Sequence, residues 1–349
     1  MNILYQQHDF PIFQNRMFDT AEEAINCPKG EIRLVEDLQT GLVFNEAFRP
    51  ESMVYDDHYQ NEQAVSPLFQ QHLNEVTFLI EKSMGRDRLV EVGCGKGYFL
   101  ELLLTKGFDV TGFDPAYEGS NLRVQRRSFA PGVMDHAQGL ILRHVLEHIE
   151  NPVGFLDQLK LANGGGGKIY IEVPCFDWIC EHRAWFDIFY EHVNYFRLSD
   201  FKRIFRELVD SGRLFGGQYL YVVAELASLR KPQIDMTDRV VFPDAFTKNI
   251  TKPNQTKPNR AAIWGGASKG VIFALLKTRV GCPIGTVIDI NPAKQGKYLA
   301  GSGLLVQSPE AALANLPSDS IIYVMNSNYL EEIKQMTNDA FTYIGVDRD

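Results

Sequence analysis

Short runs of β-branched and apolar residues alternate with helical stretches from residue 88 onward. The runs are Leu89–Val92, Asp109–Phe113, Gly139–Leu142, Lys168–Val173 and Gln218–Ala224. This alternation predicts a mostly parallel sheet with helices on its faces. The preceding stretch from Pro67 to Lys82 is amphipathic and predicts a helix, whereas residues 1–75 as a whole are weakly periodic. We therefore expect an N-terminal arm that leads into a helix.

A polar segment interrupts this rhythm before a second series of runs begins. Residues 251–259 repeat Thr-Lys-Pro-Asn around a single Gln, with two prolines and no apolar side chain, which is typical of a linker. The runs after it are Ala261–Trp264, Lys269–Leu276, Thr286–Ile288, Ser320–Met325 and Thr342–Gly345. We expect an arm and helix over residues 1–75, a first α/β domain over 76–248, a linker over 249–260 and a smaller C-terminal α/β domain over 261–349.

Composition narrows the classes of partner. The 349 residues include 35 Lys plus Arg and 44 Asp plus Glu, so the net charge of −9 disfavours a nucleic acid or an acidic membrane as a partner. The sequence lacks both an apolar stretch of roughly 18 residues and the pattern of a signal peptide, so we expect a cytoplasmic protein with a small-molecule substrate. The five cysteines are scattered and include no Cys-x-x-Cys pair, so we expect reduced thiols and no structural zinc site.

The most informative motif is Glu91-Val-Gly93-Cys-Gly95-Lys-Gly97, which follows a predicted strand and precedes a predicted helix. Glycines here permit a tight turn and let a ligand approach the backbone. Asp114 lies at the end of the next predicted strand, where a carboxylate accepts hydrogen bonds from the ribose hydroxyls of an adenosine cofactor.

The spacing of the glycines separates two kinds of adenosine cofactor. Dinucleotide sites use Gly-x-Gly-x-x-Gly, whereas these glycines occur at every second position, and an acid stands two residues before the first. The motif resembles the S-adenosylmethionine site of class I methyltransferases. The resemblance implies a Rossmann-like fold, the cofactor S-adenosylmethionine and cofactor-binding residues Glu91, Gly93, Gly95, Gly97, Asp114, Arg143 and His144.

His144-Val-Leu-Glu147-His148 also matches the His-x-x-Glu-His pattern of inverted zinc peptidases. The segment is short, is placed between predicted parallel strands and has no evident downstream ligand helix. We therefore expect no metal site.

Residues 185–196 gather several titratable side chains on one short segment. General acid/base catalysis requires such groups, although aromatic residues also fill the junctions of α/β folds. We expect the catalytic residues to be His192 as base or base-orienting residue, with Glu191, Tyr190 and Tyr59 beside it.

This segment, the strand after it and the C-terminal unit together resemble the nucleotide-sugar C-methyltransferases. In the C-terminal unit the resemblance is carried by Trp264-Gly-Gly-Ala-Ser-Lys269-Gly270, by Val287–Gly301 and by Asn326-Ser-Asn-Tyr329. The sequence departs from that family in two ways. The family's N-terminal zinc lobe, which is built on paired cysteines, is absent from this sequence. In addition, Phe189 occupies the position of the family's proposed base tyrosine.

The resemblance implies methyl transfer to a carbon of a nucleotide-linked keto-sugar, with substrate-binding residues Gly266, Lys269, Lys294 and Asn326. Lys269 follows a glycine turn that could hold a phosphate at a helix N-terminus, although such turns also serve close packing. Alternatives are an O-methyltransferase on a sugar-like molecule and a catalytically silent binding protein. A nicotinamide-dependent oxidoreductase ranks below them. The sequence does not specify an oligomeric state.

Overall fold

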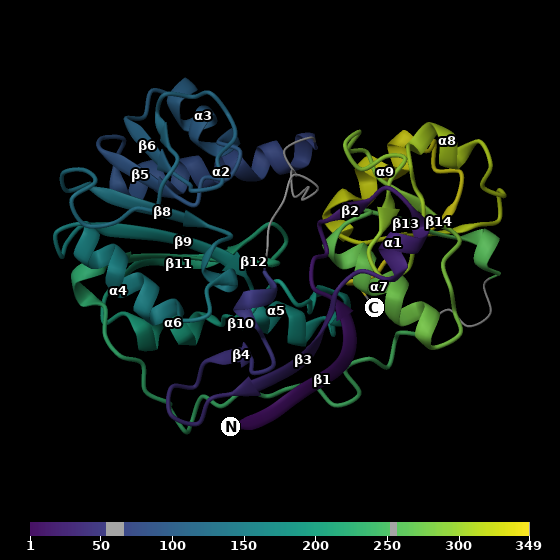
Figure 1. Cartoon of the computed structure of the whole chain (residues 1–349), viewed down its shortest axis with the longest axis horizontal. Helices are drawn as coiled ribbons and strands as arrows, with labels where there is room; N and C mark the ends of the chain where they lie inside the picture. Colours follow the sequence, from purple (N-terminus) through teal and green to yellow (C-terminus); the bar gives the residue numbers. More distant parts are fainter. Residues whose placement is uncertain (54–65, 252–256, 349) are drawn as a thin grey trace.

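The computed structural model describes residues 1–53, 66–251 and 257–348. A seven-stranded sheet dominates it, and Figure 1 shows this sheet between two layers of helices. In spatial order its strands are β11 (Leu208–Leu214), β12 (Tyr219–Glu225), β9 (Lys168–Pro174), β8 (Gly139–Arg143), β5 (Leu89–Val92), β6 (Val110–Phe113) and β7 (Val124–Gln125).

The pairing in this sheet is parallel from β9 through β7, and β12 is antiparallel to both of its neighbours. Both faces are apolar: Leu140 and Leu142 pack into one core and Ile141 into the other. The helices α2 (Pro67–Met84) and α3 (Tyr98–Thr105) contribute to the second core, and α4 (Pro152–Ala162), α5 (Phe176–Glu181) and α6 (Leu198–Ile204) to the first. The predicted α/β fold with a parallel-dominated sheet is confirmed.

The C-terminal unit is a second, smaller α/β layer with an all-parallel, five-stranded sheet. Its strands in spatial order are β16 (Val306–Gln307), β14 (Thr286–Ile288), β13 (Ala261–Trp264), β17 (Ile321–Val324) and β18 (Thr342–Gly345). The helices are α7 (Ser268–Arg279), α8 (Pro309–Leu313) and α9 (Leu330–Met336).

The N-terminal residues differ from the arm that we expected. They form an antiparallel sheet of β1 (Asn2–Pro11), β3 (Lys29–Glu36) and β4 (Val43–Asn45), which β10 (Asn194–Tyr195) completes. The pairing of β1 with β3 shifts register twice, between Ile3 and Tyr5 and between Gln7 and Phe10. Each shift breaks the two-residue alternation by which a strand is recognised in a sequence.

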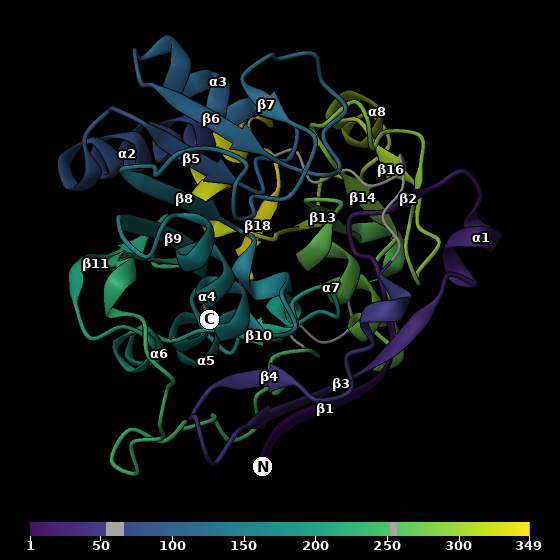
Figure 2. The same cartoon turned by 60° about the vertical axis from the view of Figure 1, so that its left-hand side comes forward.

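The same N-terminal chain contacts both α/β layers. Its sheet takes β10 from the first layer, and β2 (Met17–Phe18) pairs with β15 (Tyr298–Leu299) of the C-terminal unit. The short helix α1 (Ala21–Ile25) lies beside this second contact, and Figure 2 shows β1 and β3 passing beneath the body of the molecule. Among the described residues, no helix is long and apolar enough to span a membrane.

Both sheets contain a topological switch point, which is a pair of neighbouring parallel strands whose following connections run to opposite sides of the sheet. In the seven-stranded sheet this point lies between β5 and β8, and in the five-stranded sheet it lies between β13 and β17. Ligands of open α/β sheets bind beyond the carboxyl ends of the strands at such points. The fold therefore offers two binding sites, one in each unit.

Candidate active site

The loop after β5 has the backbone that its glycines allow. Gly93, Gly95 and Gly97 all have positive φ, at 72°, 54° and 82°, a region that other residues rarely adopt. A Cβ on Gly93 would lie 2.6 Å from Cγ2 of Val145, whereas a Cβ on Gly95 would meet nothing within 4 Å. Gly93 is thus needed for packing against the loop after β8, and Gly95 leaves the backbone open to a ligand.

Asp114 holds this loop from the end of β6. Its Oδ2 accepts a hydrogen bond from the backbone N–H of Gly95 at 2.7 Å, and its Oδ1 accepts one from Ala116 at 2.8 Å. The carboxylate keeps further lone pairs and is partly exposed. Asp114 is therefore tied to the glycine loop, in the place where the sequence predicts a ribose-binding acid.

A cavity of about 260 Å³ opens beside the glycine loop. Most of its lining comes from the loops after β5 and β8, the segment 187–192, α2 and the start of α7. Of the predicted cofactor residues, Glu91, Gly93, Gly95, Arg143 and His144 belong to this lining.

A network of buried charge forms one wall of this cavity. Glu172 is fully buried and accepts hydrogen bonds from Tyr170 Oη at 2.7 Å, His72 Nε2 at 2.9 Å, His144 Nε2 at 3.1 Å and Arg143 Nη2 at 3.2 Å. Burial alone would raise the pKa of Glu172, but Arg143 and the two histidines hold it well below its usual range. Glu172 therefore orients Arg143 and His144 at the cavity, where their positive charge favours an anionic group of a ligand.

Two residues of this wall have pKa values moved far from their ordinary range. Burial acts to lower the pKa of His144, but its contacts with Glu147 and Glu172 prevail and raise the pKa to about 9. Burial raises the pKa of Glu91 to about 8, although the nearby Arg143 opposes this. Shifted values of this kind concentrate at functional sites.

His192, the predicted base, lines the cavity and is buried. Burial lowers its pKa well below the ordinary value, and the charge of nearby groups, including His144 and Lys269, lowers it further. The ring of His148 lies against it with a centroid separation of 4.9 Å, and the ring of Phe189 lies 4.0 Å away. His192 is therefore neutral at physiological pH and has a lone pair available for a proton.

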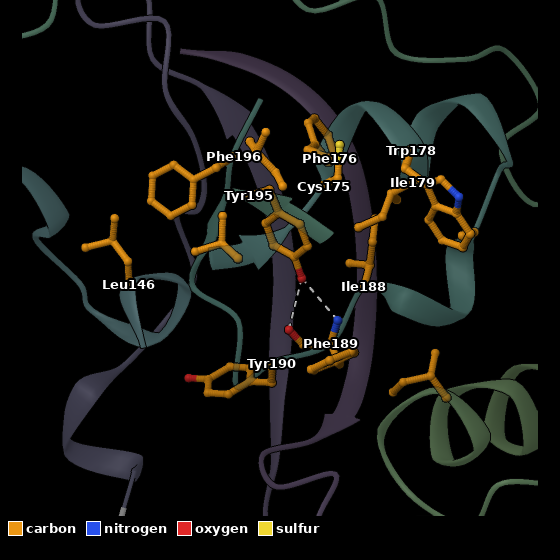
Figure 3. Packing of buried hydrophobic residues seen from close by; sticks show 14 of the residues in the cluster. Leu146, Cys175, Phe176, Trp178, Ile179, Ile188, Phe189, Tyr190, Tyr195 and Phe196 are labelled. Atoms are coloured by element: carbon orange, nitrogen blue, oxygen red, sulfur yellow. Dashed lines mark hydrogen bonds between the residues drawn. The ribbon is translucent and has the colours of Figure 1, made fainter. Parts of the chain in front are cut away.

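The other predicted catalytic residues have different surroundings. The Glu191 carboxylate accepts hydrogen bonds from the backbone N–H groups of Gln14 and Asn15, the latter at 3.2 Å, and so anchors the N-terminal chain. The Tyr190 hydroxyl accepts one from the backbone of Arg49 at 2.8 Å, and its ring fills a space above Gly30. Figure 3 shows this hydroxyl pointing away from Phe189 and Tyr195. Tyr59 lies outside the described residues.

A second cavity, of about 210 Å³, lies at the carboxyl edge of the five-stranded sheet. Asp289 repeats there the arrangement of Asp114: its Oδ2 accepts from the N–H of Gly266 and its Oδ1 from that of Asn291, both at 2.8 Å. Lys294 Nζ lies 3.4 Å from the same carboxylate. Of the predicted substrate-binding residues, Lys269, Lys294 and Asn326 line this cavity, and Gly266 forms part of its glycine turn.

The two cavities adjoin. Asn15, Tyr219, Ser268 and Lys269 line both of them. Lys269 Nζ lies 2.9 Å from Asp187 Oδ2 and donates a hydrogen bond to Gln218 Oε1 at 2.8 Å, while Gln218 and Asn326 bond to each other through their amides. The lysine that the sequence assigns to a phosphate thus also joins the C-terminal unit to the first domain.

Comparison with protein families shows which class the larger α/β unit resembles. A family model described as a methyltransferase domain matches residues 59–208, which is less than half of the chain. These residues are therefore similar to a methyltransferase domain. The protein is an enzyme whose methyl donor is S-adenosylmethionine. The cavity fits this donor, since it combines an open glycine loop tied to an acid with two cationic side chains.

Several solved structures match this chain at low sequence identity. They include a 1,6-didemethyltoxoflavin N1-methyltransferase of Burkholderia thailandensis with bound S-adenosylhomocysteine, at 16% identity over 44% of this chain and 77% of that one, with a TM-score of 0.35. A methyltransferase of Archaeoglobus fulgidus is 18% identical over 46% of this chain and 100% of that one, with a TM-score of 0.33. A methyltransferase of Mesorhizobium loti is 13% identical over 45% of this chain and 99% of that one, with a TM-score of 0.36. No curated protein matches the sequence.

Sequence reasoning missed several residues of the site. Asn15 and Asp187 carry no motif, and only the folded chain brings them to the cavities. Gln218 reaches the site through its hydrogen bonds with Lys269 and Asn326. Asp187 does stand within the titratable segment 185–196, and this position is the one signal that could have identified it.

Proposed function

We propose that this methyltransferase acts on a small molecule that spans both cavities, with its reacting end beside His192 and its distal end at the glycine turn before α7. A nucleotide-linked keto-sugar has the required form, because it joins a compact sugar to an anionic diphosphate and a nucleoside. The observation that carries the proposal is that the two cavities, each at the switch point of a parallel sheet, share Lys269 and three further lining residues.

The proposed binding mode divides the acceptor between the two units. The turn Gly265–Ala267 precedes α7, and the N-terminus of a helix favours a phosphate. A Cβ on Gly270 would lie 2.0 Å from the carbonyl oxygen of Gly265, so the turn and the helix pack closely. Asp289 and Asn326 provide polar groups for the nucleoside or sugar hydroxyls, and Lys294 adds a positive charge.

In the proposed reaction, the neutral His192 takes a proton from the acceptor. Bound S-adenosylmethionine supplies the electrophilic methyl group. For a carbon acceptor, the proton comes from the carbon beside the ketone, and the positive charge of His144 and Lys269 in the same cavity favours the resulting enolate. Burial of the site excludes water from the methyl donor.

Methylation of oxygen is the second candidate, and Phe189 favours it. This apolar ring lines the cavity beside His192 at the position where the resemblance expects a base tyrosine. When the methyl group goes to a hydroxyl, the reaction needs only one general base to take the hydroxyl proton, a role that His192 can fill.

A methylation assay separates these candidates. The protein is incubated with S-adenosylmethionine that carries an isotopically labelled methyl group and with a panel of nucleotide-linked keto-sugars and their alcohols, and the products are analysed by mass spectrometry and NMR. The proposal expects a label on the carbon beside the ketone, whereas a methyl ether indicates the oxygen acceptor. Absence of transfer to every nucleotide-linked compound, with transfer to an unrelated small molecule, would contradict the acceptor class.

A further inference from the structure

One corner of the first cavity has the composition of a metal site. Within residues 1–53, 66–251 and 257–348, Glu147, His148 and His192 form a group whose potential ligand atoms all lie within 4.8 Å of one another. All three residues line the cavity. Glu147 and His148 follow β8 on a short 3-10 turn (Leu146–His148), and His192 comes from a segment more than 40 residues away in sequence.

Glu147 is the first sign that this corner holds a cation. Only 1% of its surface is exposed, and neither carboxylate oxygen accepts a hydrogen bond from the described residues. The nearest cationic atom is His144 Nδ1, 3.4 Å from Oε1, which is an ion-pair contact rather than a well-formed hydrogen bond. This ion pair leaves Oε2 of Glu147 without a donor, and a coordinated cation would satisfy that buried oxygen.

The two histidines have free lone pairs at this corner. His148 Nδ1 lies 2.8 Å from the backbone carbonyl oxygen of Glu191, so Nδ1 carries the proton and donates it, and Nε2 keeps a lone pair. His192 Nδ1 is buried and has no hydrogen-bond partner among the described residues. A histidine fixed by a carbonyl through its other nitrogen is the usual arrangement at protein metal sites.

We propose that Glu147, His148 and His192 bind one divalent transition-metal ion, such as Zn²⁺ or Fe²⁺, with its open coordination positions facing the cavity. Two imidazoles and one carboxylate suit these ions, whereas Mg²⁺ and Ca²⁺ prefer oxygen ligands. The proposal departs from our expectation of a metal-free site. The His-x-x-Glu-His pattern contains two of the three ligands, but the third is His192 rather than His144.

A bound ion changes what His192 can do. When Nδ1 coordinates a metal it has no lone pair for a proton, so the metal-bound form and the base described above are alternative states of the same residue. An oxygen of the acceptor can occupy an open position on the ion, where its negative charge is stabilised.

Metal binding alone tests the inference, without any turnover. Untagged protein is treated with a chelator, desalted and titrated with Co²⁺, whose absorption bands report the coordinating atoms, and bound Co²⁺ is then displaced with Zn²⁺. Wild type is compared with Glu147→Gln, which keeps the shape and removes the carboxylate, and with His192→Asn. The control is His8→Asn, which removes an exposed histidine beside Glu31 on β3.

We expect one Co²⁺ per chain, bound at least about 100-fold more weakly by Glu147→Gln and by His192→Asn and unchanged in His8→Asn. Equal binding by wild type and both cavity variants, loss of binding in His8→Asn, or thiolate charge-transfer bands that place Co²⁺ on a cysteine would each overturn the proposal. Affinity for S-adenosylhomocysteine, measured on the same samples, shows that each variant is folded. It also separates failure of the metal site from failure of the methyltransferase assignment.

Discussion

Lys269 Nζ lies 2.9 Å from Asp187 Oδ2, and this ion pair joins the glycine turn of the C-terminal unit to the wall of the methyltransferase cavity. The lysine side chain is 19% exposed and the aspartate side chain 7% exposed, so the pair is largely shielded from water. The ammonium group also lies 5.1 Å from the ring centre of Trp178. The two units are thus coupled at the point where their cavities meet.

Breaking this pair should destabilise the protein. Lys269→Met leaves Asp187 buried without its cation, and loss of one partner of a buried pair costs about 3–5 kcal/mol of unfolding free energy. Lys269→Met combined with Asp187→Asn should cost less than the sum of the single changes, which a double-mutant cycle of urea unfolding measures. Lys297→Met is the control, because its pair with Asp19 is exposed and contributes at most about 1 kcal/mol. Additive costs for the first pair would show that the contact is energetically unimportant.

Substitution of Asp114 and substitution of Asp289 should weaken the binding of different ligands. Each carboxylate holds its own glycine loop through two backbone hydrogen bonds, and an asparagine can accept only with its single oxygen. Hydrogen bonds to charged groups contribute about 1.5–3 kcal/mol, so Asp114→Asn should weaken S-adenosylhomocysteine at least about 10-fold in calorimetry.

Asp289→Asn serves as the matched control for that measurement. It should leave the affinity for S-adenosylhomocysteine unchanged and raise the KM for the acceptor. If Asp289→Asn weakened S-adenosylhomocysteine as much as Asp114→Asn does, the assignment of the two cavities would be wrong.

Stability should depend on pH through His144. Its pKa in the folded protein, about 9, lies above the ordinary value of 6.5, so its stabilising contribution is complete below pH 6.5 and is lost as pH rises through 9. The difference in unfolding free energy between wild type and His144→Gln should shrink by up to about 3 kcal/mol between pH 6.5 and 10. Urea unfolding at several pH values measures this, with exposed His8→Gln as control. A difference that stays constant with pH would contradict the assigned ion pairs.

Replacing His192 should reduce turnover and spare cofactor binding. General bases contribute about 10²–10⁴-fold to the rate, so His192→Gln should lower kcat by that factor while the Kd for S-adenosylhomocysteine stays near the wild-type value. Tyr190→Phe is the comparison, because the Tyr190 hydroxyl bonds to the backbone of Arg49. A larger loss of kcat in Tyr190→Phe than in His192→Gln would reverse the two roles.

The sequence predicted the parts of the fold that have local patterns. The ends of β5, β13 and β14 agree with the predicted runs, because buried parallel strands are short, apolar and bounded by turn residues. The ends of the edge strand β18 agree as well. The glycine loop and Asp114 were found for a similar reason, since their spacing reflects one local turn. The strand β1 was missed because its register shifts disrupt the alternation.

The side-chain arrangement of the site was less predictable. Glu191 and Tyr190 belong to a segment of titratable residues, but their polar atoms bond to the backbone of the N-terminal chain. Asn15 and Asp187 both line the cavity but are far apart in sequence, so only tertiary packing brings them to the same site. The titratable residues of segment 185–196 therefore indicated the region of the active site. Only the fold shows which of their side chains face the cavity.

The most direct test of the account is a crystal structure of the protein with S-adenosylhomocysteine and a nucleoside diphosphate such as thymidine diphosphate. We expect the cofactor sulfur in the cavity lined by Gly95 and His192, and the diphosphate at the turn of Gly265–Ala267 with Lys294 nearby. A diphosphate bound away from that turn, or a sulfur atom facing away from His192, would contradict it.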